Sequence, residues 1–122
     1  MKNRNGVVEE IKVFLEKVPG IRYAFIYGSY AENPENQEGE VDLMVVGGPD
    51  LVEMDETISK AGMELNRTIY ITSFTAREFR ERIEVKDESV LEALEGPRIM
   101  LIGHEKEMVG ISNANSWQTT AV

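Results

Sequence analysis

Apolar side chains recur along the chain in two spacings, one typical of helices and one typical of strands. From about residue 5 to residue 18 they fall three or four positions apart with charged residues between them, which predicts an amphipathic helix. Residues 21–27 are a run of β-branched, aromatic and small residues, which is typical of a buried strand. Residues 40–46 predict a second strand, and the polar stretch before it predicts a short helical turn followed by an exposed loop.

Helices and strands continue to alternate in the second half of the chain. Residues 50–65 carry apolar side chains at helical spacing, residues 67–73 (RTIYITS) and 98–102 predict a third and a fourth strand, and two short helices lie between these strands. Three of the helices are preceded by residues that can cap them: Asp50, Thr75 and Asp87. Strands that alternate with helices predict an α/β (α+β) fold, with a mixed antiparallel and parallel sheet of four to five strands flanked by helices.

Length and composition are those of one folded domain. The chain has 122 residues, of which 42% are hydrophobic and 29% charged, enough for one core and too few for two ordinary domains. We expect residues 1–111 to form this domain and residues 112–122, which lack periodicity, to be a loose tail. Because no apolar run approaches the ~20 residues that span a bilayer and no apolar block marks a secretory signal, we expect a cytoplasmic protein without a membrane partner.

The net charge and the residue types present limit the partners and the reactions that the chain can have. Thirteen Lys and Arg against 22 Asp and Glu give a net charge of −9, which argues against nucleic acid and anionic lipid as partners. The absence of cysteine excludes disulfides, thiolate zinc sites and cysteine nucleophiles. Since His104 is the one histidine, carboxylates, hydroxyls and backbone groups must carry any reaction.

Two features lie on consecutive predicted strands. Gly28-Ser29 ends the first, where glycine allows close approach to the backbone and serine offers a hydroxyl to an anion; the alternative is a plain turn in which Ser29 caps the residues that follow. Glu40 and Asp42 begin the second, and alternation along a strand points both carboxylates to the same face. The two carboxylates repel each other unless a hard cation such as Mg²⁺ or Mn²⁺ binds between them. The alternative interpretation is that both acids are solvated at the exposed start of the strand.

Taken together, the two features read YGSYAENPENQEGEVDL: a hydrophobic residue and Gly-Ser, ten residues, then acid, hydrophobic, acid. This pattern resembles the minimal nucleotidyltransferases of the polymerase-beta-like superfamily, whose Gly-Ser and paired acids are separated by about nine to thirteen residues. The later segments TSFTAREFRERI and VLEALEGPRIMLIG are similar to the end of nucleotidyltransferase domains common in archaeal stand-alone proteins. The resemblance covers roughly residues 7–109.

The resemblance implies a nucleotidyltransferase fold and a role for each motif residue. Gly28 and Ser29 would contact the β- and γ-phosphates of ATP or another nucleoside triphosphate. Glu40 and Asp42 would be the catalytic acids and would hold Mg²⁺ or Mn²⁺ at the α-phosphate. The implied reaction is transfer of a nucleoside monophosphate, AMP, to a hydroxyl on a protein or small molecule.

Two departures from the family pattern leave a second function open. The first acid is Glu40 where Asp is usual, and Tyr70 stands where active members carry a third acid; a phenol is neutral at pH 7 and is a weak metal ligand. The alternative that the resemblance implies is a non-catalytic, antitoxin-like or regulatory module that pairs with a small helical partner of the HEPN type. A remnant of a larger regulator is a third alternative.

Other residues have plainer interpretations. Tyr30, beside Gly-Ser, is a candidate for stacking on a base. Arg67 is expected to be a solvated arginine at a strand edge rather than a phosphate ligand, His104 an exposed surface histidine, and Tyr70 an aromatic residue that packs beside the acids. Trp117 falls in the tail.

Overall fold

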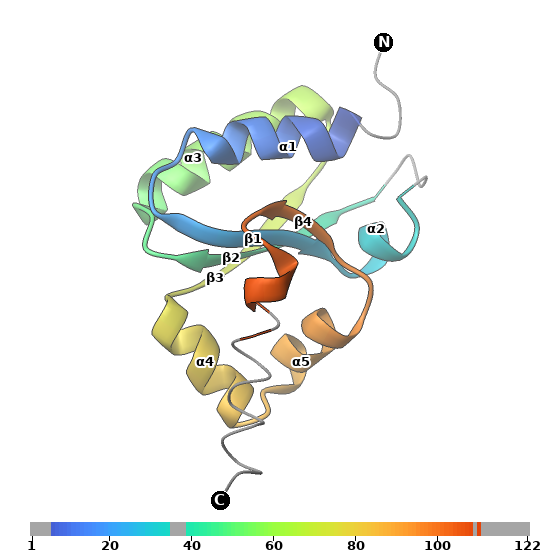
Figure 1. Cartoon of the computed structure of the whole chain (residues 1–122). Helices are drawn as coiled ribbons and strands as arrows, with labels where there is room; N and C mark the ends of the chain where they lie inside the picture. The colour runs from blue at the N-terminus through green and yellow to red at the C-terminus, as the bar shows by residue number, and fades with distance from the viewer. Residues whose placement is uncertain (1–5, 35–38, 109, 111–122) are drawn as a thin grey trace, which may run out of the picture.

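The computed structural model describes residues 6–34, 39–108 and 110, and these form helices on both sides of one sheet (Figure 1). The expectation of a loose tail falls on residues outside this range. The elements are α1 (Gly6–Glu16), β1 (Ile21–Tyr27), α2 (Ser29–Glu32), β2 (Val41–Gly47), α3 (Leu51–Leu65), β3 (Ile69–Phe74), α4 (Ala76–Glu84), α5 (Glu88–Glu95) and β4 (Ile99–Ile102).

The sheet has four strands in the order β3-β2-β1-β4. β1 pairs antiparallel with both β2 and β4, whereas β2 and β3 are parallel and are joined by the long helix α3. A parallel pair needs such a crossover, because the chain must return to the starting end of the sheet. The mixed sheet confirms the fold class that the sequence predicts.

Alternation along the central strands divides the core between the two faces of the sheet. On one face, Ala24 and Leu43 pack with residues of α1 and α3, and every second residue of β2 is buried there. On the other face, Phe25 and Met44 pack with Phe79 of α4 and with residues of α5. Figure 1 shows α1 and α3 above the sheet and α4 and α5 below it.

Local capping sets where several helices begin. The Asp50 carboxylate accepts hydrogen bonds from two amides of the first turn of α3, Thr75 and Glu78 form a reciprocal capping box at α4, and Asp87 accepts from the amide of Val90 in α5. These side chains satisfy amides that have no partner inside the helix. The three capping residues expected from the sequence are confirmed.

Two predicted boundaries are wrong by two residues, each for a local reason. The first helix ends at Glu16 rather than at Val18, because the next two amides bond three residues back in a tightened turn. The third strand begins at Ile69 rather than at 67, because Asn66 is left-handed (φ 55°) and the Arg67 amide still donates to Gly62 O. In the described residues, no helix has the length and apolarity required to cross a membrane.

Candidate functional site

The turn after β1 lies directly against an acid of β2. Tyr27 and Asp42 are paired in the antiparallel register, so Gly28 follows at the level of the Asp42 side chain. Gly28 has φ +75°, and a Cβ built on it would stand 2.8 Å from Asp42 Oδ2. A side chain at position 28 would therefore be strained and would collide with the carboxylate, so glycine is what brings the turn and the acid together.

Ser29 is the first residue of α2 and is exposed. Gly28 occupies the capping position before it, and the short helix closes through hydrogen bonds to Gly28 O and Ser29 O from the amides of Glu32 and Asn33, both 3.0 Å. The plain-turn alternative, in which Ser29 caps the residues that follow, is therefore wrong.

Glu40 and Asp42 carry their carboxylates on the face of the sheet that α4 and α5 cover, because Val41 and Leu43 between and beyond them point into the opposite core. Glu40 is exposed just before β2, and Asp42 is half-buried within it. Partial burial raises the pKa of Asp42 above its ordinary value, and the negative charge of Glu40 raises it further. The two carboxylates thus repel each other across a short distance.

Tyr70 lies on the other side of Asp42. It is the register partner of Asp42 in the parallel β2–β3 pair, and its hydroxyl donates to Glu40 Oε2 at 3.4 Å. The side chain is 50% exposed. Asp42 therefore stands between Tyr27 and Tyr70, and within the described part of the chain no three His, Cys, Asp or Glu residues gather as a metal-holding group.

Arg67 is a residue that sequence reasoning placed wrongly. It is half-buried rather than solvated: its guanidinium lies 5.3 Å from the centre of the Tyr30 ring, and its Nη1 donates to Gly39 O at 3.3 Å. Tyr30 is only 2% exposed and belongs to the apolar core, which rules out the expected stacking on a base. Burial raises the pKa of Tyr30, and the charge of Arg67 lowers it in part. No local sequence pattern predicts the contact between Arg67 and Tyr30, because it joins segments that are far apart in the chain.

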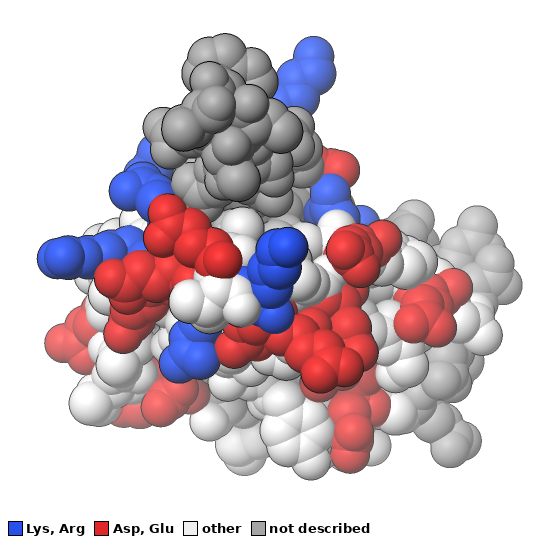
Figure 2. Space-filling model, turned by 90° about the horizontal axis from the view of Figure 1, so that it is seen from below, with Lys and Arg blue, Asp and Glu red and all other residues white. Residues whose placement is uncertain are grey.

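The surface of α4 and α5 carries both signs of charge (Figure 2). Arg82 pairs with Asp87 at 3.0 Å, and Arg98 pairs with Glu105 at 3.1 Å. His104 is exposed, as expected. Interspersed charges of this kind form solvated surface rather than a continuous basic patch.

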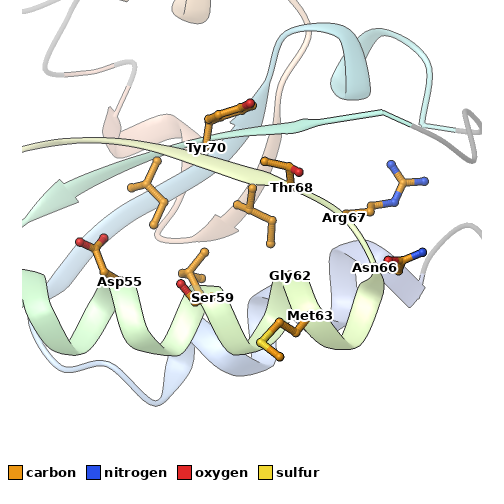
Figure 3. Close-up of a pocket in the computed structure, with 11 residues that line it drawn as sticks. Asp55, Ser59, Gly62, Met63, Asn66, Arg67, Thr68 and Tyr70 are labelled. Atoms are coloured by element: carbon orange, nitrogen blue, oxygen red, sulfur yellow. The ribbon is translucent and has the colours of Figure 1, made fainter.

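A separate groove of about 770 Å³ lies between α3 and β3 (Figure 3). Asp55, Ser59 and Met63 line its helical side. Tyr70 points from β3 away from α3, toward the opposite face of the sheet. The groove therefore lies on the α3 face of β3, whereas the Tyr70 side chain lies on the face of the sheet that carries the acid pair.

Comparison with known proteins identifies the fold. No family model matches the sequence, and no curated protein matches it. Among solved structures, a toxin-antitoxin structure with AMP-PNP superposes on this chain with a TM-score of 0.62 at 13% identity. The match covers 93% of this chain and 87% of that one. A tri-AMPylated Shewanella oneidensis HEPN toxin in complex with MNT antitoxin gives 0.61 at 13% identity, covering 97% and 87%. The toxin-antitoxin MntA-HepT gives 0.57 at 12% identity, covering 94% and 86%. The chain thus has an MNT-like nucleotidyltransferase fold, which confirms the resemblance.

Proposed function

We propose that this chain binds ATP or another nucleoside triphosphate with a divalent cation, Mg²⁺ or Mn²⁺, and transfers a nucleoside monophosphate to a hydroxyl acceptor. The observation that carries the proposal is the position of Gly28 beside Asp42: a Cβ built at residue 28 would stand 2.8 Å from Asp42 Oδ2, so the Gly-Ser turn lies next to the pair of acids. Two solved structures of the same fold support it: one contains AMP-PNP and the other an AMPylated toxin.

The donor set fits a hard divalent cation. Glu40 and Asp42 offer carboxylate oxygens, and the raised pKa of Asp42 reflects a buried and repelled charge that a cation would relieve. Two protein carboxylates leave positions for phosphate oxygens and water, as is usual for Mg²⁺ at a nucleotide. When bound, the cation supplies Lewis-acid stabilisation of the charge that builds up on the phosphates.

The residues of the chain then have separate tasks. Gly28 has no side chain between the backbone and a phosphate, and the exposed Ser29 hydroxyl donates to a phosphate oxygen. Glu40 and Asp42 would hold the cation near the start of β2, and the cation would offset the charge of the α-phosphate there. The net charge of −9 favours a protein or small-molecule acceptor over nucleic acid, and the proposed site of action is the cytoplasm.

A second function is favoured by the residue at position 70. Tyr70 donates to Glu40 where a further acid would complete the metal site, so the chain is also suited to act by binding alone. The matched structures are toxin–antitoxin complexes, one of them an MNT antitoxin bound to a HEPN toxin. The corresponding partner here is a small helical protein of the HEPN type, which the chain would neutralise as an antitoxin-like module.

Metal-dependent nucleotide binding tests the proposal. We expect the full chain to bind ATP in the presence of Mn²⁺, and Asp42→Asn to weaken this binding at least about tenfold, or ~1.4 kcal/mol. The matched control is Asp55→Asn, which changes an exposed acid in the α3–β3 groove and should leave the affinity unchanged. Calorimetry measures the affinity, and a folded wild-type chain that shows no metal-dependent binding contradicts the proposal.

The variant Tyr70→Asp separates the two functions. If it transfers labelled AMP to a HEPN-type partner where the wild-type chain does not, the wild-type chain acts on that partner by binding, and its third acid has been lost. If the wild-type chain already transfers AMP to the partner, the catalytic function holds.

A further inference from the structure

We propose that Tyr70 is itself an acceptor, so that the chain transfers the nucleoside monophosphate of its bound nucleotide to the phenolic oxygen of its own Tyr70. This inference rests on the proposed function, because the same bound nucleotide is the donor. It adds a covalent modification site on β3.

The order of the strands places Tyr70 on the acceptor side of the acid pair. The Gly28-Ser29 turn follows β1, Asp42 lies on β2 and Tyr70 on β3, and these strands are neighbours in the order β1, β2, β3. In-line displacement at phosphorus requires the attacking oxygen and the leaving group on opposite sides of the phosphorus atom. With the outer phosphates at the turn and the α-phosphate at Asp42, the opposite side is that of Tyr70.

The Tyr70 hydroxyl is both accessible and next to the acid pair. The side chain is 50% exposed, and its oxygen lies 3.4 Å from Glu40 Oε2, to which it donates. Tyr23 and Tyr30, in contrast, are each 2% exposed. A phenol is protonated at pH 7, so its proton must leave as the oxygen attacks, and the exposure of the side chain gives that proton a path to water.

The transfer balances without a further reactant. The Tyr70 oxygen forms a bond to the α-phosphorus of ATP, and the bond from this phosphorus to the oxygen that bridges to the β-phosphate breaks. Pyrophosphate leaves with the bonding electron pair. The phenolic proton passes to water, which reaches the half-exposed Tyr70 side chain.

Mass spectrometry of the intact chain incubated with ATP and Mn²⁺ tests the inference. We expect one adduct with the mass of AMP minus water, located on Tyr70 by peptide analysis. Because donor and acceptor lie in the same molecule, its first-order rate constant should not change with protein concentration. Tyr70→Phe, which removes one oxygen atom, should lose the adduct.

The control variants separate an acceptor from a structural residue. Tyr27→Phe changes the other register neighbour of Asp42 and should keep the adduct on Tyr70. Tyr70→Phe should bind the α,β-methylene analogue of ATP with Mn²⁺ as the wild type does, within about threefold by calorimetry, since this readout needs no transfer.

The outcomes also distinguish this inference from the proposed function. A wild-type chain that binds the analogue but carries no adduct on Tyr70, or a Tyr70→Phe chain with the same adduct, overturns the inference and leaves nucleotide binding intact. A tagged Asp42→Asn chain that becomes modified when mixed with wild type overturns transfer within one molecule. A chain that does not bind the analogue at all overturns both.

Discussion

The two faces of β2 differ although their residues alternate along one strand. On the α1 and α3 face, Val41, Leu43 and Val45 are fully buried in an apolar core. On the α4 and α5 face, Met44 and Val46 are buried, whereas Asp42 is only half-buried and Glu40 is exposed. The side chains of one strand thus have different surroundings on its two faces. The face toward α1 and α3 is closed and packs in the core, whereas the face toward α4 and α5 is open at one end, where charged side chains reach the solvent.

Removing a side chain from the closed face should have the largest effect. Leu43→Ala deletes a fully buried side chain and leaves a cavity, so we expect the free energy of unfolding to fall by about 2–5 kcal/mol in urea denaturation. As a control, Met63→Ala changes a side chain that is 81% exposed and should cost within about 0.5 kcal/mol. A loss below ~1 kcal/mol for Leu43→Ala would show that this face is not the closed one.

A smaller loss is expected where α4 begins over the open face. Thr75→Ala removes the hydroxyl that accepts from the Glu78 amide at 3.0 Å, and we expect a loss of about 0.5–2 kcal/mol in the free energy of unfolding. Thr75→Ser keeps the hydroxyl and is the matched control. Equal thermal midpoints for the alanine and serine variants would contradict a role for the capping box.

The smallest effect should be the pH dependence that Asp42 contributes. Because its pKa is raised in the folded state, the folded chain holds this proton more tightly than the unfolded chain. The stability it provides is present below its ordinary pKa of 3.8 and is lost as pH rises through the raised value. Urea denaturation across this window should show a fall for the wild type that is missing in Asp42→Asn; parallel profiles would contradict it.

Much of the fold follows from short-range signals. Asp50, Thr75 and Asp87 cap their helices as their neighbours predict, and alternation through residues 40–46 correctly assigns the direction of each side chain. The pairing of strands is different, because register depends on contacts between distant segments. That Asp42 lies opposite both Tyr27 and Tyr70 could be read only from the structure.

The part of the candidate site that forms a sequence motif could be predicted from the sequence. The spacing from Gly28 to Asp42 indicates the residues that meet, and the structure brings them together. The placement of Arg67 over the Tyr30 ring was missed, because a strand start that looks solvated in the sequence is covered by α2. The groove of about 770 Å³ beside α3 carries no such motif, so the sequence does not indicate it.

The close approach of Gly28 to Asp42 also restricts how this site can be lost during evolution. A Cβ at position 28 meets Asp42 Oδ2 at 2.8 Å, so the glycine is held in place by the acid as well as by its own backbone angle. If Asp42 is shortened first, the collision disappears and only the cost of a left-handed backbone remains at position 28. Substitution of both residues is therefore less costly in one order, in which the acid changes before the glycine.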